Sequence, residues 1–298
     1  MSKPATVLYD APGPRAKRIY NVVSVAVAAL MVGAGYLVYT ALDDKGQLTS
    51  EKWSPFVEST SWTTYLLPGI RGTLIAAAVS ILLALILGAI LGIGRLSDHR
   101  PIRWIAGFIV ELFRAIPVLI LMIFSYQLFA AYNVFQSAYL ALAAVIVSLT
   151  LYNGAVIAEI VRSGINSLPK GQSEAAMALG MRKGQIMATI LLPQAVTAML
   201  PAIISQMVVA LKDSALGYLI GYVEVVRSGQ QIGAYYGNYL PSLIVVAIIM
   251  IIINSTLTVV ATRVEKRLRA GKRTGAAAKN VPDLSEVSVP GMDITDKP

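Results

Sequence analysis

Long apolar stretches, separated by short polar ones, organise most of this chain. Six of them hold about 20 or more mostly apolar residues, which is enough to cross the roughly 30 Å hydrocarbon layer of a bilayer. They comprise residues 19–42, 72–94, 104–131, 137–159, 194–222 and 239–262. Because a helix satisfies its backbone hydrogen bonds internally, such stretches cross a membrane as helices. The pattern therefore predicts an all-α membrane protein with about six transmembrane helices.

The third and fourth apolar stretches follow each other closely. No charged residue lies between Ala115 and Ala158. We therefore expect a short turn to join the two spans near Tyr132, Asn133 and Gln136.

The two ends of the chain differ from its apolar middle. We expect residues 1–18 to be a cytoplasmic segment, 19–42 an extra N-terminal transmembrane helix and 43–69 an extracytoplasmic loop. Five further helices would form a core over residues 70–267, and the polar tail 268–298 is expected to be disordered. The basic stretch before the first span also fits a cleaved signal peptide. Its apolar length exceeds the roughly 7–15 residues of a signal peptide and favours an uncleaved anchor.

Composition agrees with a membrane protein. Of 298 residues, 56% are hydrophobic and 14% are charged, against about a quarter charged in soluble domains. Cysteine is absent, which excludes disulfides, thiolate nucleophiles and cysteine-ligated metals. The only histidine is His99, between Asp98 and Arg100, so neither a metal site nor histidine-based catalysis is expected.

The net charge of +9 is explained by topology. With the amino terminus inside, 19 of the 25 lysines and arginines fall on the cytoplasmic side. This asymmetry is the usual signal for membrane orientation. We therefore expect a multi-pass protein with both termini in the cytoplasm, whose partner is the lipid bilayer and not nucleic acid.

A more polar segment, "EAAMALGMRKGQIMATILLP", separates the fourth and fifth spans. Pro169 suits the first turn of a short helix, with Ser167 as a cap and Glu174 near its positive end. Gly180 suits the residue after that helix, where a positive φ is needed. A second short helix would begin at Arg182 and Lys183. The segment is thus expected to be a helical pair at the cytoplasmic membrane face.

The same segment resembles the EAA motif of permease subunits of bacterial ABC importers. That motif has Glu-Ala-Ala, then glycine, isoleucine and Leu-Pro at fixed spacings, and this chain matches every position. "SLPKGQSEAA", "ELFRAIPVLI", "LKDSALGYLIG" and "GTLIAAAVS" are similar to the polar amino-acid uptake branch, and "RAIPVLILMIFSYQLF" looks most like actinobacterial glutamate permeases. Glu-Ala-Ala alone also fits a plain connecting loop, but the neighbouring motifs argue against that interpretation.

The resemblance implies a type I ABC importer permease fold whose cytoplasmic coupling helices lie at about residues 163–193, in a bacterial cell membrane. It implies three partners: cytoplasmic ABC ATPase subunits, a second identical or homologous permease, and an extracytoplasmic amino-acid-binding protein. The expected coupling residues are Lys170, Gly171, Glu174, Ala175, Ala176, Gly180, Ile190 and Pro193. The chain has no G-x-x-x-x-G-K-[ST] phosphate loop. It is therefore expected to be non-catalytic and without a cofactor, with ATP and Mg²⁺ bound by the ATPase.

Charged residues inside the predicted spans are costly and suggest a substrate pathway or an ion pair. Glu111 and Arg114 could neutralise each other, as could Glu159 and Arg162. Alternatively, cations could line the path of an amino acid, one beside a helix that Pro117 breaks and the other beside a helix that Gly217 unwinds or kinks. The residues assigned to this path are Arg114, Pro117, Asn153, Lys212, Asp213 and Ser214.

Two other classes remain open. An ion-coupled secondary transporter or channel would act without an ATPase and would show an inverted repeat, which is not visible here. A membrane scaffold would not need charges within its spans.

Overall fold

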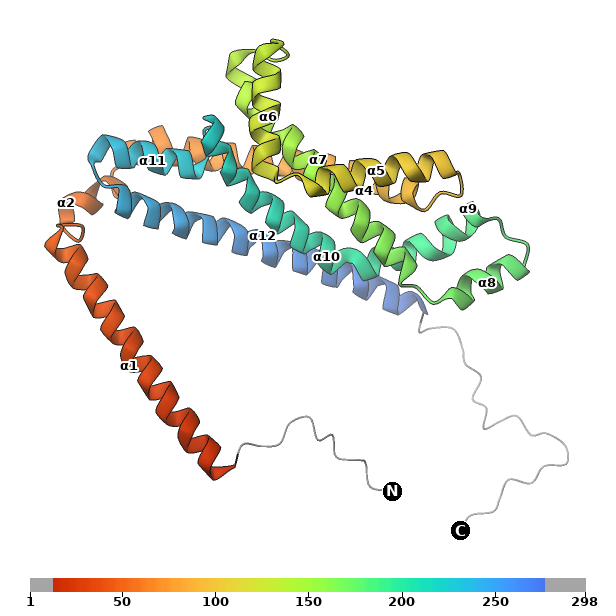
Figure 1. Cartoon of the computed structure of the whole chain (residues 1–298), viewed down its shortest axis with the longest axis horizontal. Coiled ribbons are helices and arrows are strands. Elements are labelled where there is room, and N and C mark those ends of the chain that lie inside the picture. The colour runs from red at the N-terminus through yellow and green to blue at the C-terminus, as the bar shows by residue number, and fades with distance from the viewer. Residues whose placement is uncertain (1–12, 277–298) are drawn as a thin grey trace. The chain divides into compact units, whose positions relative to one another are not determined.

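The computed structural model describes residues 13–276, and residues 1–12 and 277–298 lie outside the description. Every regular element in the described part is helical, which confirms the all-α prediction (Figure 1). Five helical stretches are long and apolar enough to span a membrane, and a bent helix pair can count as a sixth. The prediction of about six spans is therefore confirmed.

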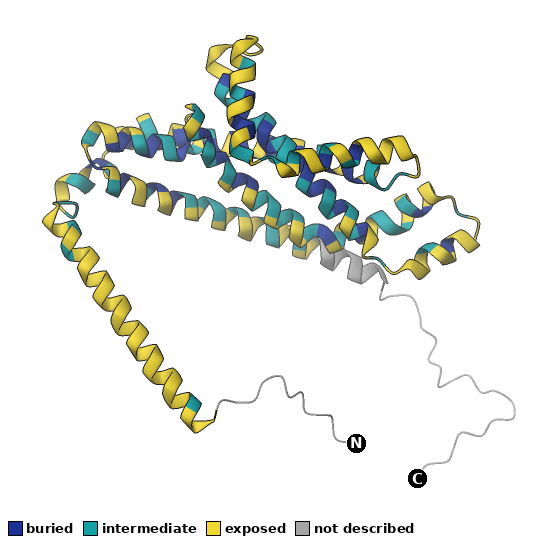
Figure 2. Cartoon of the chain, viewed as in Figure 1, coloured by how far each residue is buried: buried dark blue, intermediate teal, exposed yellow. Residues whose placement is uncertain are grey.

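The described part of the chain divides into two compact units, and residues 13–65 with 229–245 form the first. Its long helix α1 (Pro14–Asp44) has no buried residue (Figure 2). Short helices follow, namely α2 (Ser50–Trp53), η1 (Ser54–Phe56), α3 (Ser59–Ser61) and η2 (Trp62–Leu66). Lys52 Nζ donates to Gly237 O and Asn238 Nδ2 donates to Lys52 O, both at 2.8 Å. These bonds join the two sequence segments of the unit.

The second unit comprises the described residues 66–228 and 246–276. It is built on the close packing of α4 (Leu67–Arg95) against α7 (Ser137–Asn166). A Cβ added to Gly88 would lie 2.6 Å from Ile157 Cβ, and one added to Gly92 would lie 2.7 Å from Val161 Cβ. Glycine at these two positions lets the helix backbones approach, which is how helices associate in lipid without a hydrophobic driving force.

The third predicted span is broken at Pro117. Helix α5 (Arg100–Ala115) and helix α6 (Val118–Ala131) meet at an angle of 101°, and Figure 1 shows α6 turned away from α5. Ile116 is extended, with φ −87° and ψ 126°, as residues before proline prefer. A turn at residues 132–136, with Asn133 at φ 48°, leads into α7, as predicted.

The fifth predicted span begins earlier than expected. Helix α9 (Lys183–Ile186), the π-helical η3 (Met187–Leu191) and α10 (Leu192–Asp213) form one helical stretch, which continues as the 3₁₀ segment η4 (Ser214–Ile220). The stretch spans Lys183–Ile220, whereas the apolar pattern indicated residues 194–222. The hydropathy pattern missed this start because the first turn is polar.

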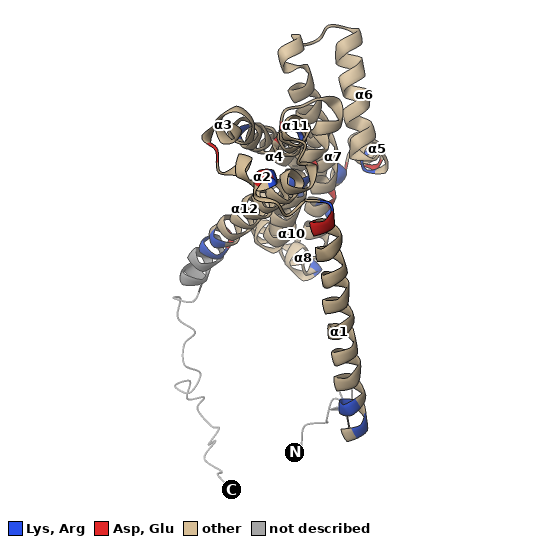
Figure 3. Ribbon diagram, turned by 90° about the vertical axis from the view of Figure 1, so that its left-hand side faces the viewer, with Lys and Arg blue, Asp and Glu red and all other residues tan. Residues whose placement is uncertain are grey.

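The last span is also longer than predicted. After α11 (Val225–Tyr236), helix α12 (Tyr239–Ala276) continues past residue 267, where the core was expected to end. The prediction of a disordered tail from residue 268 is therefore wrong for residues 268–276, and the rest of that tail is not described. In Figure 3 basic residues lie at the beginning of α1 and toward the end of α12.

Candidate functional site

The first half of the predicted coupling segment forms helix α8 (Lys170–Ala178). Pro169 stands at its N-cap and not in its first turn, and Ser167 does not cap it. Ser167 instead ends α7, and its hydroxyl donates to Gly164 O at 2.8 Å. Glu174 lies in the middle of α8, too far along for the predicted interaction with the positive helix end. These three local predictions are wrong, because α7 extends to Asn166 and shifts the start of α8.

Gly180 ends α8 as predicted. Its φ is +79°, in the left-handed region. The Gly180 N–H donates to Met177 O at 2.9 Å, and the Met181 N–H donates to Ala176 O at 3.1 Å. This pair of bonds is a Schellman motif, which satisfies the last carbonyls of a helix and favours glycine at the turning residue.

The second half of the segment begins at Arg182, whose backbone N–H donates to Gln185 Oε1 at 2.9 Å. The next residue, Lys183, anchors the segment to the α4–α5 connection. Its ammonium donates to Leu96 O at 3.2 Å and forms an ion pair with Asp98. Since Lys183 starts the stretch that becomes α10, this contact links the coupling segment to two membrane helices.

The coupling segment exposes both polar and apolar side chains. Met177 is 56% exposed and Leu179 is 82% exposed, although both are large and apolar. Among the predicted coupling residues, Ala176 is buried and Ile190 is half-buried. The exposed ones are Lys170, Gly171, Glu174, Ala175, Gly180 and Pro193. A cavity of about 340 Å³ lies between α8 and the start of the following stretch, beside Lys170, Glu174 and Lys183. The segment thus presents two large apolar side chains beside exposed polar ones at its turn.

A network of charged side chains centres on Glu159 of α7. Its carboxylate lies 2.5 Å from Arg95 Nη1, 2.5 Å from Arg162 Nη2 and 3.8 Å from Arg114 Nη1. Glu111 pairs with Arg95 at 3.4 Å and is not paired with Arg114. The expected Glu159–Arg162 pair is therefore present, but the suggested Glu111–Arg114 pair is wrong. Arg114 faces α7 because α5 packs on that helix.

Asn153 forms a polar contact between two helices. It is 1% exposed, and its Oδ1 accepts a 2.7 Å hydrogen bond from Gln206 Nε2 on α10. Its Nδ2 donates to Leu149 O at 2.9 Å. Sequence reasoning missed Gln206, because an isolated glutamine in an apolar stretch carries no signal of its partner.

The other predicted path residues are not brought together with Arg114. Ser214 is buried, and its hydroxyl donates to Leu211 O at 2.7 Å at the start of η4. Lys212 is exposed, Asp213 is half-buried, and neither forms an ion pair within residues 13–267. The change from α to 3₁₀ geometry after Asp213 agrees with the expected local unwinding.

A buried carboxylate at the start of α11 was also missed. Glu224 is fully buried, and it accepts the N–H groups of Val226 at 2.8 Å and Arg227 at 2.6 Å. Burial raises the pKa of its carboxyl to about 7, although the two N–H donors act in the opposite direction. The adjacent Val225 N–H donates to Thr73 Oγ1 at 3.2 Å, so this loop packs on α4.

The chain is similar in sequence to known transport proteins. Residues 80–270 match the family described as "binding-protein-dependent transport system inner membrane component". The chain is 60% identical to the glutamate transport system permease protein GluD of Corynebacterium glutamicum, over 85% of this chain and 92% of that protein. It is 36% identical to the arginine transport system permease protein ArtQ of Bacillus subtilis, over 69% and 93% respectively.

Solved structures give the same fold. A crystal structure of an amino acid ABC transporter with histidines superposes with a TM-score of 0.65 and 26% identity, covering 71% of this chain and 98% of that one. An inward-facing structure of the MetNI methionine ABC transporter superposes with a TM-score of 0.59 at 24% identity, over 71% and 99% respectively. The predicted importer permease fold is thereby confirmed.

Proposed function

Because the chain belongs to the family of binding-protein-dependent transport system inner membrane components, we propose that it is the permease subunit of an ATP-driven importer for glutamate or a related acidic or amide amino acid. The observation that carries the substrate assignment is the 60% identity to a glutamate permease over 85% of the chain. The chain itself catalyses no reaction in this role. ATP and Mg²⁺ bind to a separate ATPase.

The proposed ATPase contact is the coupling segment, residues 170–193. Support comes from the exposed Met177 and Leu179 and from the rigid turn at Gly180. Lys170, Gly171, Glu174 and Ala175 are exposed on the same short helix. Closure of the ATPase would move this segment, and Lys183 would transmit the displacement to the α4–α5 connection.

The proposed substrate path runs along α7 near Arg114 and the Asn153–Gln206 pair. Arg114 is 44% exposed in its side chain, and its contact with Glu159 is long at 3.8 Å. It can therefore exchange that partner for a substrate carboxylate. Since Lys212, Asp213 and Ser214 have no contact with Arg114, they would act at a different depth.

The proposed assembly has two permeases, identical or homologous, because two coupling segments must meet two ATPase subunits. Substrate would arrive from an extracytoplasmic binding protein, for which residues 43–65 of the first unit offer a docking surface. In this arrangement both termini are cytoplasmic.

Uptake of labelled glutamate tests the proposal. The chain, its cognate ATPase and its binding protein are co-expressed in a strain without glutamate uptake, and transport is measured with and without cellular ATP. We expect ATP-dependent uptake that needs all three proteins. Uptake driven by an ion gradient without the ATPase would instead identify a secondary transporter.

Copurification tests the coupling segment separately. We expect the tagged chain to retain its ATPase in mild detergent and Gly180→Trp to lose it. An ATPase that still binds and supports full uptake with Gly180→Trp would exclude this segment as the contact. Gly33→Trp in α1 is a control, because a side chain added there also meets open space, but at an ordinary helical φ and outside the coupling segment.

A further inference from the structure

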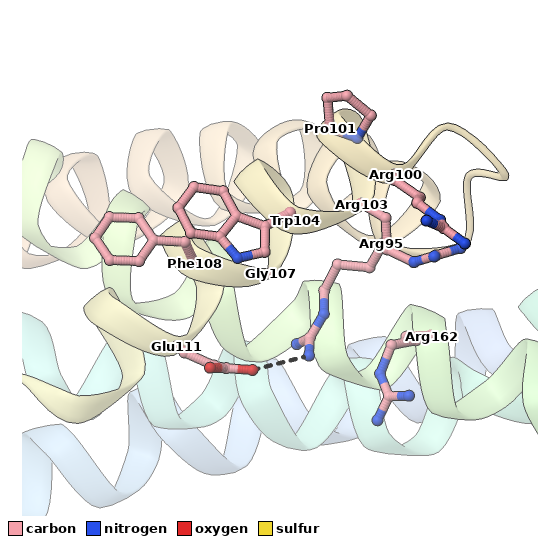
Figure 4. A pocket seen from close by; sticks show the side chains of 9 residues that line it. All are labelled: Arg95, Arg100, Pro101, Arg103, Trp104, Gly107, Phe108, Glu111 and Arg162. Atoms are coloured by element: carbon pink, nitrogen blue, oxygen red, sulfur yellow. Dashed lines mark hydrogen bonds and ion pairs between the residues drawn. The ribbon is translucent and has the colours of Figure 1, made fainter.

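A cavity of about 770 Å³ lies beside the α4–α5 connection, next to the charge network of Glu159 (Figure 4). Four arginines line it, against a single carboxylate, Glu111. The arginines are Arg95, Arg100, Arg103 and Arg162. A cavity with this composition is suited to an anion.

Only two of the four arginines are neutralised within the described residues. Arg95 and Arg162 pair with Glu159, and Arg95 also contacts Glu111. Arg100 and Arg103 are exposed and form no ion pair with any described residue. Arg103 Nη1 donates only to the neutral Ser97 O, at 3.2 Å. These two guanidinium groups are thus available to bind a phosphate group in a bidentate manner.

One wall of the cavity is aromatic. The Trp104 and Phe108 rings stack with a centroid distance of 5.9 Å and an interplanar angle of 10°. Trp104 is 72% exposed and Phe108 is 56% exposed. Tryptophan at such a position is typical of the membrane–water interface, where its ring lies at headgroup level. A small water-soluble anion would make no apolar contact with these two rings.

The cavity lies at the same end of the unit as the coupling segment. Lys183 of that segment bonds Leu96 and Asp98, which belong to the connection beside the cavity. The basic end of a membrane protein faces the cytoplasmic leaflet, where basic pockets between helices bind anionic lipid headgroups.

We propose that this cavity binds the headgroup phosphate of an anionic phospholipid, with Arg100 and Arg103 holding the phosphate and Trp104 and Phe108 contacting the glycerol and upper acyl chains. Bound lipid would then fix the start of α5 relative to α4. The proposal does not depend on the transported substrate or on the ATPase contact.

Native mass spectrometry of the purified chain, exchanged into equal amounts of phosphatidylglycerol and phosphatidylcholine, tests the proposal. We expect retained phosphatidylglycerol to exceed phosphatidylcholine by tenfold or more, since each basic group near the surface adds about 1 kcal/mol. Arg100→Gln/Arg103→Gln should remove most of this preference. Both side chains are exposed, so the fold should survive, as an unchanged melting temperature will show.

A matched pair of cations on α12 provides the control. Lys266→Gln/Arg267→Gln removes the same charge outside the cavity and should leave lipid retention unchanged. An equal loss with this control would show diffuse attraction and overturn the proposal, as would the absence of any lipid preference. Arg100→Lys/Arg103→Lys should retain part of the preference, because charge remains without the bidentate geometry.

Competition with inorganic phosphate and with glutamate tests whether the cavity binds lipid or another anion. Excess inorganic phosphate should leave the lipid bound, because phosphate cannot use the aromatic wall. If it displaces the lipid completely, the cavity is a free-anion site. Displacement by glutamate would place the cavity on the substrate path, and either result overturns the lipid assignment.

Discussion

Gln206 of α10 and Asn153 of α7 share a 2.7 Å hydrogen bond inside the second unit. Asn153→Leu leaves the Gln206 amide without this partner, which costs about 1–3 kcal/mol. We expect a lower melting temperature in detergent. The double variant Asn153→Leu/Gln206→Leu should be more stable than the sum of the single effects, because both polar groups are then removed. Simple additivity would show that the bond contributes nothing.

Glu159→Gln should destabilise the protein more than any other single change in the charge network. It removes the carboxylate shared by Arg95, Arg114 and Arg162 and leaves their charges close together. The Glu159 side chain is 23% exposed, so the loss should cost about 1–3 kcal/mol, between the values for exposed and buried ion pairs. Glu111→Gln is the control. Its side chain is 73% exposed, so its loss should cost less than about 1 kcal/mol. Thermal unfolding followed by circular dichroism measures both, and equal effects would contradict a central role for Glu159.

Gly88→Ala should lower stability by about 1–3 kcal/mol, because the new Cβ would lie 2.6 Å from Ile157 Cβ. Gly33→Ala in α1 meets no neighbour within 4 Å and should be neutral or slightly stabilising. Melting temperatures of the two variants give the comparison. A stable Gly88→Ala protein would show that α4 and α7 can separate without loss.

Gly180 tests backbone conformation independently of side-chain volume. Gly180 has a φ of +79° and open space around it. Asparagine tolerates this backbone conformation and valine does not, so Gly180→Asn should retain ATPase binding and Gly180→Val should weaken it. Copurification with the ATPase and ATP-dependent uptake report the effect. If asparagine and valine behave alike, the left-handed turn is not the property that matters.

Glu224 should make stability depend on pH. Its pKa is near 4.5 when unfolded and about 7 when folded, so the folded state retains its proton over this interval while the unfolded state loses it. Stability should therefore fall as the pH rises from about 4.5 to about 7, and level off above that. Glu224→Gln cannot ionise and should lack this decline. Melting temperatures of both proteins, measured from pH 4.5 to pH 7, test this expectation. If they change with pH in the same way, Glu224 is not the group responsible.

Apolar pattern and local motifs predicted the helical class, the break at Pro117 and the turn at Gly180. The helical class follows from the length of the apolar stretches. The break and the turn each follow from the backbone conformations that proline and glycine allow. The start of a helix at Lys183 was predicted, but its continuation into the fifth span was missed, because the polar first turn separates it from the apolar stretch in the hydropathy pattern.

Ion-pair partners were predicted less well than helices. Arg114 was provisionally paired with Glu111 because three residues separate them on one helix. In the structure its carboxylate comes from Glu159 on α7, 45 positions away. Glu224 lies in a short loop, and only its place just before an amphipathic helix could have indicated a cap.

The unbroken stretch from Lys183 to Ile220 has a mechanical consequence. At about 1.5 Å per residue, its 38 residues have a length along the helix of more than 50 Å, beginning within the coupling segment. A helix of this kind acts as a lever, and Pro201 and the 3₁₀ segment after Asp213 are its softest points. In the proposed importer, a displacement of the coupling segment would tilt α10 before bending it at these two points, so the helix would carry the movement into the membrane.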